Sequence, residues 1–146
     1  MGTPTQSAPG MVLDNGMFAR PVSDLGSPIP VTLDVEDSVE EAVNFMLLKQ
    51  MGCVLATTGE TLAGILTERD IITKVVIERS DMSSVRIAQV MTPNPESFRE
   101  TDTIGSVIKK MSAGGFRHAP IVDVENKPVG IISVRDIVQF VANNIS

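Results

Sequence analysis

The chain has 146 residues, 42% of them apolar, and a formal net charge of −6. This length suits one compact domain, or two very small units that share a core. The acidic balance argues against nucleic-acid binding, because phosphate contacts need a positive face, and the absence of Trp and Tyr leaves no aromatic platform for stacked bases. One cysteine and one histidine cannot form an internal disulfide or a metal site of usual ligand spacing, so we expect a reducing, cytoplasmic location.

The first segment, residues 1–20, is rich in Gly, Pro, Thr, Ser and Asn. It has no apolar run long enough for a signal peptide or a membrane span. We therefore expect residues 1–20 to be a disordered leader.

The remainder of the chain contains an internal repeat. The segment Gly-Ile-Leu-Thr-Glu-Arg-Asp-Ile, which starts at Gly64, recurs as Gly-Ile-Ile-Ser-Val-Arg-Asp-Ile from Gly130, a spacing of 66 residues. Upstream, Ser-Pro-Ile-Pro at 27–30 matches Thr-Pro-Asn-Pro at 92–95 with a spacing of 65. One residue is therefore inserted between the two blocks, and we place the insertion at Gly114-Gly115.

The first half of each copy begins with a short segment, 22–26 or 87–91, that leads into a Pro-rich extended stretch. A helix follows, with Ser38 or Thr103 as its N-cap and, in the first copy, Glu41 as the partner in a capping box. Apolar residues at helical spacing support these helices.

The second half of each copy contains two short apolar runs that predict a β-hairpin, with turns at 58–60 and 125–127. A last helix is predicted to begin at Asp70 or Asp136. The copies therefore span 21–79 and 86–146, with a polar linker at 80–85.

The fold class that follows is α/β (α+β), with two β-α-β-β-α repeats. A unit of about sixty residues buries little core by itself. We therefore expect the two sheets to pack against each other around a pseudo-twofold axis, and the helices to bury further surface against a second chain.

The repeated motif resembles the nucleotide-contact motif of cystathionine-β-synthase (CBS) domains. In it, a strand ends Gly-apolar-apolar-Thr/Ser and, after two residues, an Asp opens a helix. The stretch Gly-Phe-Arg-His-Ala-Pro-Ile-Val-Asp at 115–123 also resembles the start of that family's second strand. The resemblance covers roughly Val22 to Ile145 and identifies the chain as a tandem CBS pair, or Bateman module, of the stand-alone kind.

The resemblance implies a ligand cleft between the paired copies. In it, the Asp at the helix start binds ribose hydroxyls, the Thr or Ser lies near the ribose or phosphate, and basic residues reach the phosphate. A carboxylate can accept both hydrogens of a cis-diol, and a helix N-terminus favours an anion. The candidate ligand-binding residues are Ile65, Thr67, Arg69, Asp70, Arg117, His118, Ile131, Ser133, Arg135 and Asp136.

The Thr67-x-x-Asp70 and Ser133-x-x-Asp136 patterns also fit plain helix capping, which is compatible with binding. The copies differ before the first hairpin strand, where we align Arg117-His118 with Met51-Gly52. We therefore expect unequal sites, with the Asp136 site holding a phosphate better.

The expected function is a regulatory module that senses an adenosine-containing nucleotide, AMP, ADP or ATP, and signals to an effector protein through conformation or assembly. NAD and S-adenosylmethionine present the same adenosine and stay as alternatives. So does a structural dimerisation or docking module with vestigial clefts. We expect no obligatory cofactor, no metal, no catalytic residue and no enzyme activity. The resemblance also implies a homodimer, either head-to-head or head-to-tail.

Overall fold

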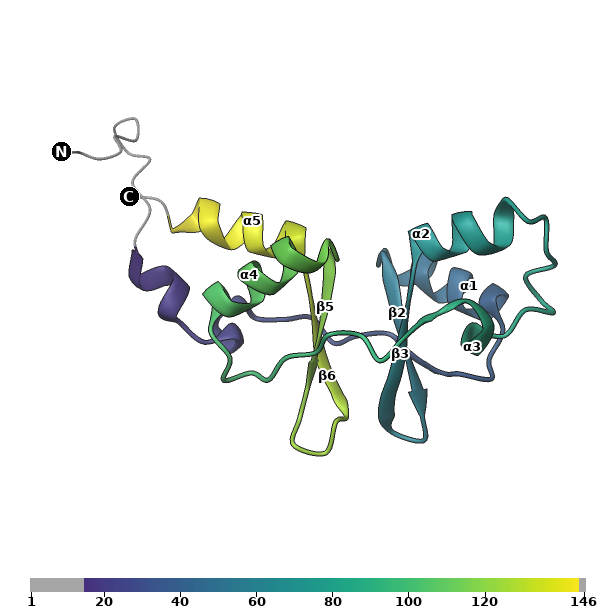
Figure 1. The fold of residues 1–146 in the computed structure, drawn as a ribbon, viewed down its shortest axis with the longest axis horizontal. Coiled ribbons are helices and arrows are strands. Elements are labelled where there is room, and N and C mark those ends of the chain that lie inside the picture. The colour runs from purple at the N-terminus through teal and green to yellow at the C-terminus, as the bar shows by residue number, and fades with distance from the viewer. Residues whose placement is uncertain (1–14, 145–146) are drawn as a thin grey trace.

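The two copies fold into two similar lobes that lie side by side, with a β-hairpin of each at the centre and helices on the outer sides (Figure 1). This computed structural model describes residues 15–144. Both lobes follow the predicted repeat of helix, hairpin and helix, and the mixed α and β architecture is confirmed.

The first lobe is built on a four-stranded sheet in the order β1-β2-β3-β4. β1 runs parallel to β2, whereas β2 with β3 and β3 with β4 are antiparallel. The last helix continues from α2 as a π-helical turn, η3. The elements are β1 (Thr32–Asp34), α1 (Val39–Lys49), β2 (Cys53–Thr58), β3 (Thr61–Thr67), α2 (Glu68–Ile71), η3 (Ile72–Val76) and β4 (Thr92–Pro93).

The second lobe has a two-stranded antiparallel sheet, β5-β6. The position of a first strand is reduced to a single parallel bridge between Phe98 and Ile121. Its elements are α4 (Ile104–Gly114), β5 (His118–Val122), β6 (Pro128–Ser133) and α5 (Val134–Asn143).

Side-chain caps fix where the helices begin. Ser38 and Glu41 form the predicted capping box of α1, and Thr103 accepts a hydrogen bond from the backbone of Ser106 at the start of α4. The last helices begin two residues earlier than predicted, at Glu68 and Val134. The reason is that Thr67 and Ser133 are the N-caps, so each Asp lies in the third helical position rather than the first.

The inserted residue lies in the hairpin turn of the second copy, and not at Gly114-Gly115 as predicted. Thr57 pairs with Leu62 around a turn of residues 58–61, whereas Val122 pairs with Pro128 around the longer turn 123–127. Both first helices end alike, on a left-handed residue at 50 or 115. The alignment of Arg117-His118 with Met51-Gly52 was therefore wrong by one residue, and their counterparts are Gly52 and Cys53.

The short segment that begins each copy packs on the opposite lobe. α3 (Ile87–Val90) joins the core of the first lobe, where it packs with Val39 and Leu66. η2 (Val22–Leu25) places Val22 in the core of the second lobe. Two matching bridges, Pro21 to Thr103 and Ser38 to Arg86, anchor this exchange.

Part of the expected leader is ordered, in contrast to the sequence prediction. Asn15–Ala19 forms the 3-10 helix η1, in which Met17 is 1% exposed and packs against Ile104 and Phe140 of the second lobe. Burial of this apolar side chain stabilises the packing of η1 on the second lobe. The rest of the predicted leader, 1–14, lies outside the described residues.

The two lobes meet through a central apolar cluster. Leu62 also donates a backbone hydrogen bond of 2.9 Å to the carbonyl of Asn126 in the opposite hairpin turn. Hydrophobic burial and this turn contact join the hairpins around the pseudo-twofold axis. The buried members of the cluster are Cys53, Leu55, Leu62, Ile65, Val122 and Ile131.

The exchanged segment provides a stability test. We expect Ile87→Ala to lower the free energy of unfolding by roughly 2–5 kcal/mol, since the side chain is fully buried in the first lobe. The matched control Ile29→Ala, at a side chain that is 87% exposed, should stay within about 0.5 kcal/mol of the parent protein. Urea unfolding measures both values, and equal effects would show that α3 does not contribute to the core.

The Cys53 thiol provides a chemical test of the central cluster. Burial, and secondarily the charge of Glu68, raise the pKa of Cys53 to about 12, so the thiol stays protonated at pH 8. Because the thiolate is the reactive species, a disulfide reagent should label the folded protein far more slowly than the protein in urea. Rapid labelling of the folded protein would contradict this packing.

Candidate functional site

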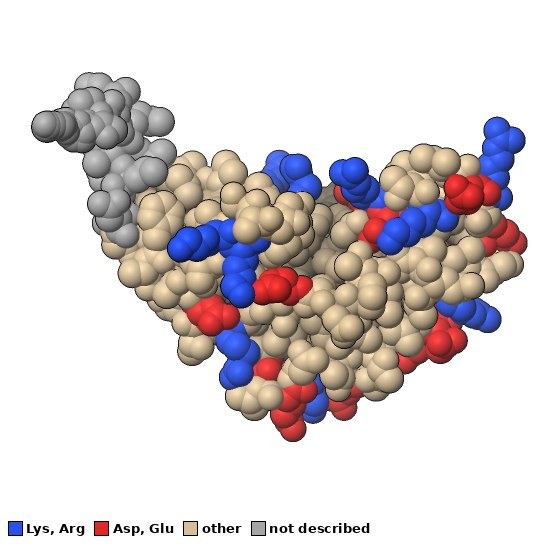
Figure 2. Space-filling model, viewed as in Figure 1, with Lys and Arg blue, Asp and Glu red and all other residues tan. Residues whose placement is uncertain are grey.

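Two clefts open between the lobes, and each combines the start of one lobe's last helix with the loop after the other lobe's first helix. Figure 2 shows the hollow between the lobes, with Lys and Arg side chains gathered along its rim. We name the clefts after the carboxylate in each, the Asp70 cleft and the Asp136 cleft.

The Asp136 cleft has a volume of about 820 Å³, within the usual range for small-molecule sites. The second lobe contributes the start of α5 and the first lobe contributes residues 49–53. Of the residues predicted for a site, it brings together Ile131, Ser133, Arg135, Asp136, Arg117 and His118.

The Asp70 cleft has a volume of about 680 Å³ and is the pseudo-symmetric counterpart. The first lobe contributes the start of α2, and the second lobe contributes residues 114–118. Of the predicted residues, it brings together Ile65, Thr67, Arg69, Asp70, Arg117 and His118.

The basic pair does not belong to one site, as the sequence analysis assumed, because Arg117 and His118 line both clefts together with Gly52 and Glu68. A Cβ added at Gly52 would lie 3.1 Å from Oε1 of Glu68 and 3.2 Å from Nε2 of His118. A side chain at position 52 would therefore crowd Glu68 and His118. We call the four residues shared by the two clefts, Gly52, Glu68, Arg117 and His118, the partition; they come from both lobes.

His118 also lies in this partition, in surroundings that favour its neutral form. Burial lowers its pKa below the usual 6.5, and the charge of Glu68 opposes that shift without reversing it. Arg117, which is exposed, therefore carries the fixed positive charge of the partition.

The carboxylates of Asp70 and Asp136 differ in how many hydrogen-bond and ion-pair partners they have within the protein. Oδ2 of Asp136 accepts one hydrogen bond of 2.8 Å, from the backbone N–H of Ser133. Within residues 15–144, the structure gives Oδ1 of Asp136 no hydrogen-bond or ion-pair partner. This oxygen is available to accept a ligand hydroxyl.

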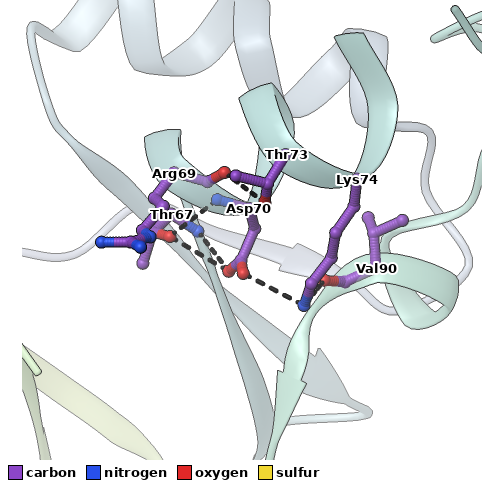
Figure 3. A network of polar contacts seen from close by, with 6 residues as sticks. All are labelled: Thr67, Arg69, Asp70, Thr73, Lys74 and Val90. Carbon is purple, nitrogen blue, oxygen red and sulfur yellow. Dashed lines mark hydrogen bonds and ion pairs between the residues drawn. The ribbon is translucent and has the colours of Figure 1, made fainter. Parts of the chain in front are cut away.

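Asp70 is held from three directions (Figure 3). Its Oδ2 accepts from the backbone N–H and the hydroxyl of Thr67, both at 3.1 Å. Its Oδ1 forms an ion pair of 3.1 Å with Nζ of Lys74, which also donates to the carbonyl of Val90 at 2.9 Å. The first-lobe carboxylate is thus largely satisfied by the protein itself.

The glycine of the repeated motif has a packing role that is separate from binding. A Cβ at Gly64 would contact Met91 and lie 3.0 Å from the carbonyl of Thr92, and one at Gly130 would lie 2.9 Å from Cβ of Ser27. Contacts this short do not occur without movement of the neighbours. A glycine is needed at both positions because a segment that connects the lobes lies directly against the strand there, residues 91–92 against Gly64 and Ser27 against Gly130.

The clefts also differ in charge. The Asp136 cleft has three cationic side chains, Lys49, Arg117 and Arg135, against Glu68 and Asp136. The Asp70 cleft has Arg69 and Arg117 against three carboxylates, Glu68, Asp70 and Glu96. The Asp136 cleft is therefore the more positively charged of the two.

Sequence reasoning missed four charged residues of this region, namely Lys49, Glu68, Lys74 and Glu96. Lys74 carries a signal that could have been used, since a Lys four residues after an Asp on a helix forms an ion pair. Lys49 and Glu68 reach the clefts only through the pairing of the lobes, which local pattern does not reveal.

The described part of the chain, 15–144, contains no group of three or more His, Cys, Asp and Glu side chains arranged to hold a metal ion. Within the same residues, no helix has the length and apolar character needed to cross a bilayer.

Comparison with known proteins gives a consistent result. The "CBS domain-containing protein CBSCBSPB3" of Arabidopsis thaliana is 33% identical over 101 residues, which cover 69% of this chain and 18% of the relative. The chain thus spans about a fifth of the length of that relative. A putative signal-transduction protein with CBS domains from Burkholderia ambifaria is 30% identical, with a TM-score of 0.74 over 88% of this chain and 91% of that one.

A second structure, the CBS domain pair of protein MJ0100 in complex with 5'-methylthioadenosine and S-adenosyl-L-methionine, is 25% identical. Its TM-score is 0.77, with 86% of this chain and 98% of that chain covered. The model of the CBS domain matches residues 22–77 and again 87–143. The chain therefore belongs to the CBS domain family and contains a tandem pair of these domains, a regulatory ligand-binding module.

Proposed function

We propose that the chain senses an adenosine phosphate, AMP, ADP or ATP, in the Asp136 cleft. The observation that carries the proposal is that Oδ1 of Asp136 has no partner within the described part of the chain and lies in a cleft that also holds Lys49, Arg117 and Arg135. A ribose diol needs a carboxylate acceptor and a phosphate needs cations, and both requirements meet here.

Each part of the ligand has a matching group. The buried side chain of Ile131 offers an apolar wall for the adenine. The Asp136 carboxylate would accept the ribose hydroxyls, and the Ser133 hydroxyl, which accepts from the backbone N–H of Asp136, lines the same cleft. Arg117 and Lys49 come from different lobes, so a phosphate held by both would favour one arrangement of the lobes. That differential affinity would be the signal to an effector protein in the cytoplasm.

The ligands in the MJ0100 pair support an adenosyl compound in general. The local charges favour a phosphate over S-adenosylmethionine, whose sulfonium would lie among three cationic side chains. The local charges discriminate less against NAD, because NAD also carries phosphates.

Titration calorimetry tests this order of preference. We expect AMP, ADP or ATP to bind more tightly than S-adenosylmethionine or 5'-methylthioadenosine, because only the phosphate uses the cationic side chains. At a ligand concentration of 100 Kd, binding should also add about 2.7 kcal/mol to the free energy of unfolding. No heat and no stabilisation with any adenosyl compound would instead favour a docking module with vestigial clefts.

A matched pair of variants tests which carboxylate binds the ligand. Asp136→Asn should weaken AMP binding roughly 10- to 100-fold, because a hydrogen bond to a charged acceptor is worth about 1.5–3 kcal/mol. Asp70→Asn alters the same position of the other capping box and should change the affinity less than roughly threefold. An equal loss of AMP affinity in the two variants would show that both carboxylates bind the ligand equally, contrary to the proposal.

The expected homodimer has support in the helices of the first lobe. Six large apolar side chains of α1, η3 and the residue after η3 remain exposed, and exposed apolar patches often mark protein interfaces. We expect a dimer by light scattering, and conversion toward monomer by Leu48→Asp; a monomeric parent protein would contradict the proposal. The exposed side chains are Phe45, Leu47, Leu48, Ile72, Val76 and Ile77.

A further inference from the structure

Lys74 has no counterpart in the second lobe. The spacing of 66 that relates the last helices places Phe140 at the equivalent position, where it is buried against Met17 and Ile104. The position one turn after Asp136 is therefore apolar, whereas the position one turn after Asp70 holds the Lys74 cation. Two copies of one capping motif consequently present different carboxylates to their clefts.

The Asp70–Lys74 pair is more restrained than an ordinary surface ion pair. Exposed pairs of this spacing contribute little, because both long side chains must be ordered in water. Here the Asp70 side chain is only 13% exposed, and Nζ of Lys74 is also fixed by its hydrogen bond to the carbonyl of Val90. That carbonyl ends α3, so the lysine joins the cleft carboxylate to a packed helix.

A ribose diol would have to compete with these internal partners. Three contacts already engage the two oxygens of Asp70, and Lys74 accounts for the contact on Oδ1. At Asp136, the same oxygen has no partner to displace among the described residues, 15–144. The free energy needed to break the contact between Asp70 and Lys74 should weaken ligand binding at the Asp70 cleft by the same amount.

We propose that Lys74 is a specificity-determining residue that closes Asp70 to ribose, so that one chain binds one adenosine nucleotide, at Asp136. This inference rests on the proposed function of the Asp136 cleft. It assigns Lys74 a role in the number of ligands bound, which a purely structural ion pair would not have.

Titration calorimetry with AMP, and with adenosine to isolate the ribose, measures the number of sites. We expect one site in the parent protein and two in Lys74→Met, with affinity at the Asp70 cleft rising roughly tenfold or more. Lys74→Gln keeps a donor for the Val90 carbonyl but removes the charge, and provides a second variant if Lys74→Met does not fold. Adding Asp70→Asn to either variant should return the count to one.

Lys110→Met is the matched control, since it removes an equal charge beside the same cleft by breaking a 2.9 Å ion pair with Glu96. It should leave one site. Two equal sites in the parent protein, one site in a folded Lys74 variant, or a second site in Lys110→Met would each overturn the role of Lys74. Absence of binding of every adenosyl compound to the parent protein would overturn the proposed function itself.

Discussion

The contact between the two hairpins is the constraint on which the rest of the structure depends. Neither lobe has enough residues to bury a full core, so Leu55 and Ile65 of the first lobe are buried against Val122 and Ile131 of the second. This packing brings the end of each first helix opposite the start of the other lobe's last helix. The clefts are therefore a direct consequence of how the hydrophobic surface is covered.

The exchange of N-terminal segments strengthens the same arrangement. Val22 and Ile87 each lie in the short segment that begins one copy, and each is buried in the core of the other lobe. The chain therefore crosses between the lobes directly after each of these segments, so each lobe holds a buried side chain from the other copy. A ligand that bridges the lobes then acts on a coupled structure and not on a flexible tether.

The sequence predicted what depends on local pattern. Helical spacing, the Ser38 cap and the repeated hairpins located the main elements, because periodicity and capping act over a few residues. The docking of Met17 and the shared position of Arg117 could not be predicted, since both depend on contacts between segments far apart in the chain. The misplaced insertion arose because sequence matching alone does not distinguish a longer turn from a longer helix end.

Duplication preserves the backbone of a site more readily than its charge. The caps formed by Thr67 and Ser133 have nearly the same geometry, since the hydroxyl must meet the backbone N–H of the Asp in both. The residue one turn further along has no such constraint, and it is Lys74 in one copy and the buried Phe140 in the other. A change at one supporting position can therefore alter the availability of a carboxylate while the motif that contains it stays intact.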